Sequence, residues 1–383
     1  MKYCNHCILP DTRPNLFILE DGRCNACHSW SKKQMNIDWN SRKNELIQFI
    51  KDVKQKTSTW DCIIPVSGGK DSTWQVIKAL EFGLKPLCIT WRTPARNQLG
   101  QRNLDNLIRL GVDHIDFSIN PTVEKIFTMT TLKKSGSLAI PMHMALFAIP
   151  LRVAVNYKIP LVLWGENSAI EYGGTKEELL GFKMTNAWLK IYGVTQATIA
   201  EDWISDQLSL KDLSPYIWPT DSELDDAGVT AAFLGWYLPW DPVETYLVAK
   251  SYGFQSLSDK PKTGYYQFAD VDDEFIITIH HWLKWYKFGF TRLWDNLAIE
   301  IRSNRMTRKH AIEIIRNLGN EYPREAIQKF CQWAELTEVS FLEIANSFRN
   351  ENIWVQAASE WEIKNFLIND WEWKQPSKLL ENS

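Results

Sequence analysis

One stretch of this 383-residue chain decides its fold: Pro65-Val66-Ser67-Gly68-Gly69-Lys70-Asp71-Ser72. A short apolar run over 62–66 precedes it, and a helical pattern over 72–82 follows it and ends at Gly83. A strand, a glycine-rich turn and a helix in this order gather backbone N–H groups and a helix N-terminus around one point. That arrangement binds phosphate, so the sequence predicts a phosphate-binding loop here.

The loop offers each kind of group that a bound nucleoside triphosphate needs. The glycines allow close approach of the backbone, the serines donate hydrogen bonds, the lysine adds positive charge, and the aspartate repels phosphate unless Mg²⁺ lies between them. These residues are Gly68, Gly69, Ser67, Ser72, Lys70 and Asp71. The loop is not a Walker A motif, because Ile64 and Asp71 occupy positions where that motif has glycine and serine or threonine.

The pattern around the loop alternates short apolar strands with helices. We expect strands over 62–66, 84–91, 112–118 and 159–164, separated by helices over 72–82, 99–110, 123–132 and 138–157. Such alternation predicts an α/β fold with a parallel sheet and helices on both faces, in which ligands bind at the carboxyl ends of the strands. The segment Gly165-Glu166-Asn167 follows the last predicted strand. Glu166 or Asn167 is expected either to hold Mg²⁺ or a ribose hydroxyl, or to cap the next helix.

The N-terminal segment contains two Cys-x-x-Cys pairs, Cys4 with Cys7 and Cys24 with Cys27. Four thiolates at this spacing predict one tetrahedral Zn²⁺ in a structural knuckle, with an iron–sulfur cluster as the alternative. We therefore expect a zinc knuckle over 1–35. His6 and His28 are expected to be exposed neighbours of the site and not ligands.

The composition bounds the remaining possibilities. The net charge of −3 does not indicate a protein that binds nucleic acid through an overall positive charge. The apolar stretch 138–155 is interrupted by His143, Arg152 and prolines, so we expect no membrane span. The start Met1-Lys2-Tyr3-Cys4 is unlike a secretory signal, and seven cysteines, four of them in metal-type pairs, favour a reduced, cytoplasmic protein. After about residue 180 the chain has helical spacing and little strand signal. We expect a nucleotide-binding domain over 36–180 and a mostly helical substrate or partner region over 181–383.

The string Ser-Gly-Gly-Lys-Asp-Ser resembles the PP-loop of the ATP pyrophosphatase superfamily, whose members split ATP into AMP and pyrophosphate. Together with the four-cysteine knuckle, Gly165-Glu166-Asn167 and the helix His-His-Trp-Leu-Lys-Trp-Tyr-Lys-Phe-Gly-Phe over 280–290, it resembles the N-acetyl sugar amidotransferase family of lipopolysaccharide and surface-polysaccharide biosynthesis. The resemblance implies an adenine nucleotide α-hydrolase-like fold. It also implies conversion of an acetamido group on a nucleotide-activated N-acetyl sugar to an acetamidino group, through an adenylylated amide and ammonia.

The resemblance also implies roles for individual residues. Pyrophosphate would be bound by Ser67, Gly68, Gly69 and Ser72. Lys70 would stabilise the charge of the pyrophosphate, and Asp71 would hold Mg²⁺. The same ATP site would include Gly165, Glu166 and Asn167. Our hypothesis for the phosphates of the sugar substrate is a set of basic residues on and beyond the helix over 274–290: Lys284, Lys287, Arg292 and Arg302.

Ammonia is expected to come from other chains. A glutaminase with an N-terminal nucleophile needs cysteine where this chain has Lys2, and no Gly-x-Cys-x-Gly elbow is present. The resemblance suggests a separate glutaminase and a cyclase-like subunit as partners. The alternative function is a tRNA-thiolating PP-loop enzyme, against which the single Cys62 and Cys88 and the negative net charge count. A non-enzymatic scaffold with a decayed loop is the third interpretation, and the intact motif argues against it.

Overall fold

A five-stranded parallel sheet forms the centre of the molecule. The structure is a computed structural model that describes residues 1–383 except 58, 175–180, 320–321, 358–359 and 374–383. The strand order is β3-β2-β1-β4-β5, and each neighbouring pair is parallel. The strands are β1 Cys62–Pro65, β2 Pro86–Trp91, β3 Asp113–Phe117, β4 Leu161–Trp164 and β5 Thr230–Phe233.

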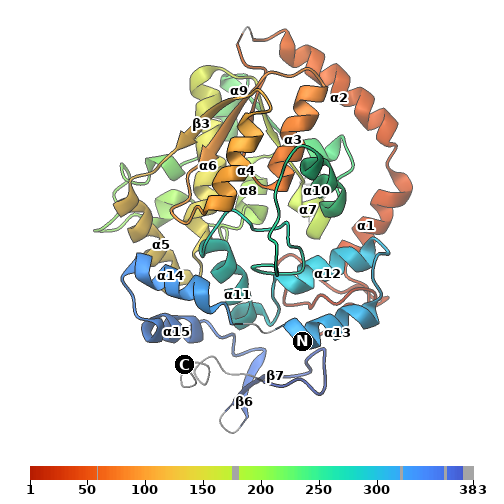
Figure 1. Cartoon of the computed structure of the whole chain (residues 1–383), viewed down its shortest axis with the longest axis vertical. Coiled ribbons are helices and arrows are strands. Elements are labelled where there is room, and N and C mark those ends of the chain that lie inside the picture. The colour runs from red at the N-terminus through yellow and green to blue at the C-terminus, as the bar shows by residue number, and fades with distance from the viewer. Residues whose placement is uncertain (58, 175–180, 320–321, 358–359, 374–383) are drawn as a thin grey trace.

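Helices surround the sheet and continue into the C-terminal region (Figure 1). Those that precede or accompany the strands are α1 Asn25–Asn36, α2 Trp39–Lys54, α3 Lys70–Glu81, α4 Gln98–Ile108, α5 Pro121–Ser135, α6 Ala139–Tyr157, α7 Ser168–Tyr172, α8 Asn186–Tyr192 and α9 Asp221–Asp226. Those that follow the sheet are α10 Pro242–Ser251, α11 Ile276–Phe288, α12 Arg292–Arg302, α13 Arg308–Leu318, α14 Arg324–Ala334 and α15 Glu338–Ser347. Short 3₁₀ turns lie at η2 Ala200–Trp203, η3 Ser214–Tyr216 and η4 Leu234–Trp236, and β6 Trp354–Ala357 pairs with β7 Glu360–Ile363 in an antiparallel hairpin.

The two faces of the sheet bury separate hydrophobic cores. Because side chains alternate along a strand, Ile63 of β1 points into one core while Cys62 and Ile64 point into the other. The first core is filled mainly by α5, α6 and the C-terminal helices, and the second by α2, α3 and α4. The predicted parallel sheet with helices on both faces is therefore confirmed.

All four predicted strands are present, but the fifth was missed. β5 pairs with β4 through Leu161–Thr230 to Trp164–Phe233, so the sheet draws a strand from the region where little strand signal was expected. The cause is that β5 reads Thr-Ala-Ala-Phe, whose two alanines have little strand propensity, and that it runs straight into η4 instead of a sheet-covering helix. The domain boundaries at residues 35 and 180 stay a prediction, although the second now falls within the span that builds the sheet.

Helix α6 is long and apolar enough to cross a membrane by composition alone. In the structure it packs against β1, β2 and β4 instead, and most of its apolar side chains are buried. We assign it as the core helix of one face of the sheet. Among the described residues, no other helix meets the same criterion.

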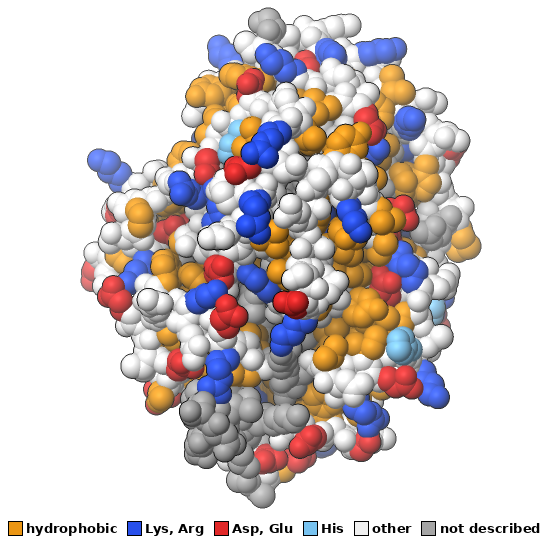
Figure 2. Space-filling view, viewed as in Figure 1, with side chains coloured by type: hydrophobic (Ala, Val, Ile, Leu, Met, Phe, Trp, Pro, Cys, Tyr) orange, Lys and Arg blue, Asp and Glu red, His pale blue; other side chains and the backbone are white. Residues whose placement is uncertain are grey.

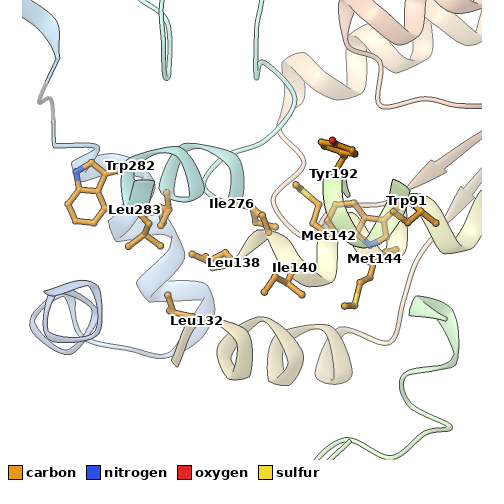
Figure 3. Packing of buried hydrophobic residues seen from close by; sticks show 14 of the residues in the cluster. Trp91, Leu132, Leu138, Ile140, Met142, Met144, Tyr192, Ile276, Trp282 and Leu283 are labelled. Carbon is orange, nitrogen blue, oxygen red and sulfur yellow. The ribbon is translucent and has the colours of Figure 1, made fainter. Parts of the chain in front are cut away.

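The C-terminal helices dock below the sheet, where α11 packs on α6 and α14 (Figure 1). Figure 3 shows the seam: Leu283 and Ile276 of α11 lie beside Leu132, Leu138 and Ile140 from α5 and the start of α6. This apolar contact fixes the position of α11 relative to the sheet. On the face drawn in Figure 2, basic and acidic side chains are interspersed and no continuous basic stripe is visible among the described residues.

Candidate active site

The phosphate-binding loop connects β1 to α3, as the sequence predicts. α3 begins at Lys70 with Gly69 at its N-cap, and no side chain of the described residues caps it. The Ser72 hydroxyl donates to the Gly69 carbonyl at 3.0 Å, and Ser67 Oγ accepts from the Gly69 N–H at 3.2 Å. The first turn of α3 is therefore open to an anion, and the helix dipole favours one there.

Gly68 gives the loop its shape. Its φ is +85°, and a Cβ at this position would lie 2.6 Å from the backbone nitrogen of Leu104 in α4. Both the left-handed backbone and the close approach of two backbones require glycine.

We expect Gly68→Ala to lower the free energy of unfolding by about 2–4 kcal/mol, since left-handed strain and overpacking against α4 add. Denaturant unfolding measures the loss. Gly111→Ala is the matched control, because Gly111 has φ +96° but a Cβ there would meet no other atom within 4 Å. Equal losses in the two variants would show that contact with Leu104 is not what requires glycine.

Lys70 and Asp71 are tied to each other and to α10. Lys70 Nζ lies 2.6 Å from Asp71 Oδ1 and 3.2 Å from Thr245 Oγ1. The same Asp71 oxygen accepts from Thr245 Oγ1 at 3.0 Å and from Trp240 Nε1 at 3.1 Å. These contacts hold both charged side chains beside the open turn of α3.

The loop faces a pocket of about 180 Å³ whose opposite wall comes from the C-terminal region. From the loop side it is lined by Ser67, Gly69, Lys70, Asp71 and Ser72, and from elsewhere by Glu166, Tyr172, Trp240, Pro242, Tyr266, Phe268, Ala269, Asp270, Val271, Asp272, Arg292, Asn296 and Ile299. The segment around Asp272 is pinned across the loop: the Asn97 side chain donates to the Val271 carbonyl at 2.7 Å, and the Glu274 N–H donates to the Ala95 carbonyl at 2.7 Å.

The carboxylates around the pocket fit a divalent cation. Burial, and then the nearby charge of Asp71, raises the pKa of Glu166 to about 7. Burial likewise raises the pKa of Asp270 and Asp272. A cation between Asp71 and Glu166 would remove their repulsion and favour ionised carboxylates, which are ligands that Mg²⁺ prefers.

The three residues after β4 have different positions. Glu166 lines the pocket. A Cβ at Gly165 would lie 2.5 Å from Gln75 Nε2, so glycine lets this loop pack on α3. Asn167 caps α7 by accepting from the Ala169 N–H at 3.0 Å, and it also accepts from Trp188 Nε1 at 2.9 Å. Of the two roles predicted for Asn167, the structure shows the capping role.

The four basic residues predicted to bind substrate phosphates do not gather in one place. Arg292 lines the pocket. Lys284 lies behind it, with Nζ 3.6 Å from Asp295 Oδ2, and burial lowers its pKa to about 8. Lys287 donates to the Gly136 carbonyl at 2.8 Å, and Arg302 is buried and donates to the carbonyls of Ala298 and Glu171. The assignment of this set stays a prediction, and the geometry supports it best for Arg292.

Several pocket residues were missed by the sequence analysis. They lie in the irregular segment before α11 and just after η4, and include Phe268, Asp270, Asp272 and Trp240. Thr245 of α10, which contacts Lys70, was missed as well. The one available signal was the acidic run Asp270-Val271-Asp272-Asp273. Only Asp273 has the local role typical of such a run, since it caps the start of α11 by accepting from the Phe275 and Ile277 N–H groups.

The four predicted metal ligands converge. Cys4 Sγ and Cys27 Sγ are 3.9 Å apart, Cys7 Sγ and Cys24 Sγ are 3.8 Å apart, and all four sulfurs lie within 4.8 Å of one another. Sulfurs bound to one tetrahedral zinc are about 3.8 Å apart, because each Zn–S bond is about 2.3 Å. The geometry therefore fits a single zinc ion. His28 pairs with Asp21 at 2.9 Å, and neither His28 nor His6 is part of the cluster.

The knuckle is built into the wall of the pocket. Arg13 Nε lies 2.7 Å from Asp295 Oδ1, and its guanidinium also reaches the carbonyl of Tyr172, a pocket residue. Lys33 of α1 forms a buried ion pair with Glu171 of α7. Arg308 of α13 donates to the Cys7 carbonyl at 2.8 Å. The knuckle thus holds α7 and α12, which carry Tyr172 and Arg292.

Comparison with protein families gives one match. Residues 250–367 match the family described as "LPS biosynthesis protein WbpG-like, C-terminal domain". The matched region contains α11 to α15 and the segment Tyr266–Asp272 that forms one wall of the pocket. The predicted resemblance to lipopolysaccharide biosynthesis proteins is therefore confirmed for this part of the chain.

Two solved structures are similar over much of their own length. One is the NMN synthetase from Francisella tularensis, with 16% identity over 59% of this chain and 99% of that chain, at a TM-score of 0.27. The other is the NH3-dependent NAD synthetase from Campylobacter jejuni in complex with nitrate, with 17% identity over 56% of this chain and 93% of that chain, at a TM-score of 0.27. Similarities at these scores do not bear on the function. No curated protein matches the chain.

The sheet topology and the loop define the class. A parallel α/β sheet carrying Ser-Gly-Gly-Lys-Asp-Ser between its first strand and first sheet helix has the PP-loop architecture that the sequence predicts. Its C-terminal region is WbpG-like. The chain thus combines a PP-loop motif with a C-terminal region similar to a family of lipopolysaccharide biosynthesis proteins.

Proposed function

We propose that this chain is an ATP-dependent amidotransferase that converts an acetamido group of a nucleotide-activated N-acetyl sugar into an acetamidino group and forms AMP and pyrophosphate. One observation carries the proposal: the PP-loop and the WbpG-like region line the same pocket. A nucleotide held by the loop and an acceptor held by the lipopolysaccharide-type domain would therefore meet there.

The loop supplies the ATP half of the reaction. The β- and γ-phosphates of ATP, which leave as pyrophosphate, bind at the open first turn of α3 and to Ser67, Gly69 and Ser72. Lys70 stabilises the negative charge of these phosphates. Gly68 contributes through its conformation, since it does not line the pocket. Asp71 and Glu166 would hold Mg²⁺, and the ion would supply positive charge to the phosphates. Gly165 and Asn167 position Glu166 between them.

The WbpG-like wall supplies the acceptor half. Arg292, which lines the pocket, contacts the phosphate of the sugar substrate or the charge that develops on the α-phosphate. Lys284 lies behind Arg292, and the Asp295 carboxylate interacts with both of these cations. The amide oxygen attacks the α-phosphorus, and the resulting adenylyl ester makes that oxygen a good leaving group when ammonia adds to the carbon. Ammonia comes from a separate glutaminase and a cyclase-like subunit, in the cytoplasm.

The remaining cysteines do not support the thiolation alternative. Cys62, Cys88 and Cys331 are buried, and none lines the pocket. Burial raises the pKa of Cys88 to about 12 and that of Cys331 to about 11, so neither is poised as a thiolate. A persulfide-carrying cysteine would need the opposite environment.

Product analysis tests the proposal. The purified chain is incubated with ATP, Mg²⁺, ammonium and a panel of UDP- and CMP-linked acetamido sugars, and nucleotides and sugars are identified by mass spectrometry. We expect AMP and pyrophosphate with one sugar, whose product is about one mass unit lighter because NH replaces O. ADP would overturn the PP-loop mechanism, and AMP with tRNA alone would favour thiolation. Glutamate released from glutamine by this chain alone would refute the separate glutaminase.

A further inference from the structure

An amide side chain on α12 faces the pocket from the WbpG-like wall. Asn296 lies four residues after Arg292, so the two side chains share a face of the helix, and both line the pocket. The remainder of Asn296 is covered by protein, since the residue is only 1% exposed. A polar side chain buried to this degree needs hydrogen-bond partners for both its oxygen and its NH₂ group.

The oxygen of this amide is fixed by the segment that leads to Tyr266. Asn296 Oδ1 accepts from the Tyr265 N–H at 3.0 Å. The neighbouring Gly264 has φ +73°, and a Cβ at this glycine would collide with Asn296 Oδ1, so only glycine lets the backbone approach so closely. Because a backbone N–H can only donate, this contact also assigns which end of the amide is oxygen and which is nitrogen.

The nitrogen of the amide is left for a ligand. Asn296 Nδ2 makes no hydrogen bond within the part of the chain that the structure describes, and it is not one of the unpartnered atoms that the protein shields completely from solvent. The small exposed part of Asn296 therefore includes this nitrogen, and the pocket is the space that the nitrogen reaches. The pocket thus contains an NH₂ group whose orientation is set before any ligand binds.

The position of this donor fits the α-phosphate of ATP. In the proposed function the loop holds the β- and γ-phosphates, and the acceptor comes from the opposite wall, so the α-phosphorus lies between the loop and α12. Its two non-bridging oxygens are anionic hydrogen-bond acceptors. Arg292 supplies a permanent positive charge on the same face of α12. A neutral donor beside this cation completes a site for one anionic group.

We propose that Asn296 donates a hydrogen bond to a non-bridging oxygen of the α-phosphate and stabilises its negative charge during adenylyl transfer. This inference rests on the proposed function. The acetamido oxygen forms a bond to the α-phosphorus while the bond from that phosphorus to the bridging oxygen of the β-phosphate breaks, and the electron pair of the broken bond leaves on pyrophosphate. The acetamido nitrogen takes up the positive charge. A donor that is already oriented stabilises the reacting phosphate without rearrangement of the site.

Asn103 of α4 is a matched control. It is 2% exposed, and its Oδ1 also accepts from a backbone N–H, that of Gln255, at 2.9 Å. Its NH₂ group differs, because it donates to the Gln255 carbonyl at 2.9 Å, and Asn103 does not line the pocket. A change to aspartate at either position keeps the accepting oxygen and replaces the NH₂ group by a second oxygen.

The first test compares Asn296→Asp with Asn103→Asp at saturating ATP, ammonium and sugar. Removal of one fixed donor to a reacting oxygen typically lowers kcat by ~10²–10³-fold, so we expect Asn296→Asp to lower kcat for AMP formation by at least ~100-fold. Asn103→Asp loses its bond to the Gln255 carbonyl, so we expect it to unfold at a lower temperature but to keep kcat within about threefold. Thermal unfolding of both variants separates the two effects.

Sulfur substitution at the α-phosphate tests the contact itself. The two diastereomers of ATPαS each replace one non-bridging oxygen by sulfur, which is a weak hydrogen-bond acceptor. We expect Asn296→Ala to slow AMP formation by ~100-fold with ATP but by less than ~10-fold with one diastereomer, because sulfur at that position has already removed the hydrogen bond. The other diastereomer should respond to the substitution as ATP does.

Three results would each overturn this inference alone. They are an Asn296→Asp enzyme within about threefold of the wild-type kcat, a raised KM for the sugar with an unchanged kcat, and an Asn296→Ala enzyme slowed equally with ATP and both diastereomers. A wild-type chain that forms no AMP with any acetamido sugar overturns the proposed function, and this inference with it.

Discussion

Asp71→Asn is expected to lower AMP formation by ~10²–10³-fold, the effect typical of removing one electrostatic contact to a reacting phosphate or oxyanion. The change removes the negative charge that would bind Mg²⁺ but keeps an oxygen that can accept from Trp240 Nε1 and Thr245 Oγ1. The fold should therefore survive while the cation site fails. Steady-state rates over a range of Mg²⁺ concentrations measure the effect.

Asp116→Asn is the control for this experiment. Asp116 is also an acid near the carboxyl edge of the sheet, but Arg96 holds it in a two-pronged ion pair with both distances at 2.7 Å, and it does not line the pocket. We expect its rate to stay within a few-fold of wild type. If Asp71→Asn keeps a tenth or more of the wild-type rate with an unchanged Mg²⁺ requirement, Asp71 is not the cation ligand.

Sequence patterns predicted those parts of the site whose residues are close together in the sequence. The order strand, glycine-rich turn, helix lies within about twenty residues, and its geometry follows from the backbone freedom of Gly68 and the start of α3 at Lys70. The metal site was predictable for the same reason. Four thiolates can surround one tetrahedral metal ion in only a few arrangements, and this restricts the positions of Cys4, Cys7, Cys24 and Cys27. In both cases one physical requirement selects the residues and their spacing.

The opposite wall could not be predicted in this way. Asp270 and Asp272 reach the loop only because an irregular segment is pinned to residues 95–97, some 175 positions earlier in the chain. Charge in the sequence also does not tell where a cation lies: Arg302 reads as an available cation, yet its guanidinium is buried against the carbonyls of α7 and α12. Periodicity tells which residues share a helix face, but not whether that face meets a ligand or another backbone.

Removing the knuckle metal should have a large effect on stability and a secondary effect on the active site. We expect Cys24→Ser to lose bound zinc, because all four sulfurs are fully buried and lie at single-ion spacing. Zinc contributes roughly 10–16 kcal/mol to the folding of isolated knuckle peptides, so residues 1–36 are expected to unfold locally and become sensitive to protease. Metal analysis of the purified chain, limited proteolysis and thermal unfolding measure these changes.

The secondary effect follows from the contacts that the knuckle makes. Arg13 and Lys33 hold Asp295 and Glu171, which lie on the helices that carry Arg292 and Tyr172 into the pocket. Loss of the knuckle takes Lys33 from Glu171 and takes Arg13 from Asp295, which keeps only Lys284 as an ion-pair partner among the described residues. Removing a partner from a buried carboxylate is destabilising. AMP formation should therefore fall although no knuckle residue lines the pocket.

Cys331→Ser is the matched control, since Cys331 is a buried cysteine outside the cluster and should leave the metal content unchanged. Recovery of iron and sulfide in place of zinc would replace the metal assignment by an iron–sulfur cluster. A Cys24→Ser chain that keeps wild-type protease resistance and activity would show that the knuckle neither depends on the metal nor supports the pocket. If the chain behaves as expected, the knuckle fixes the positions of α7 and α12, and it affects catalysis through the ion pairs of Arg13 and Lys33.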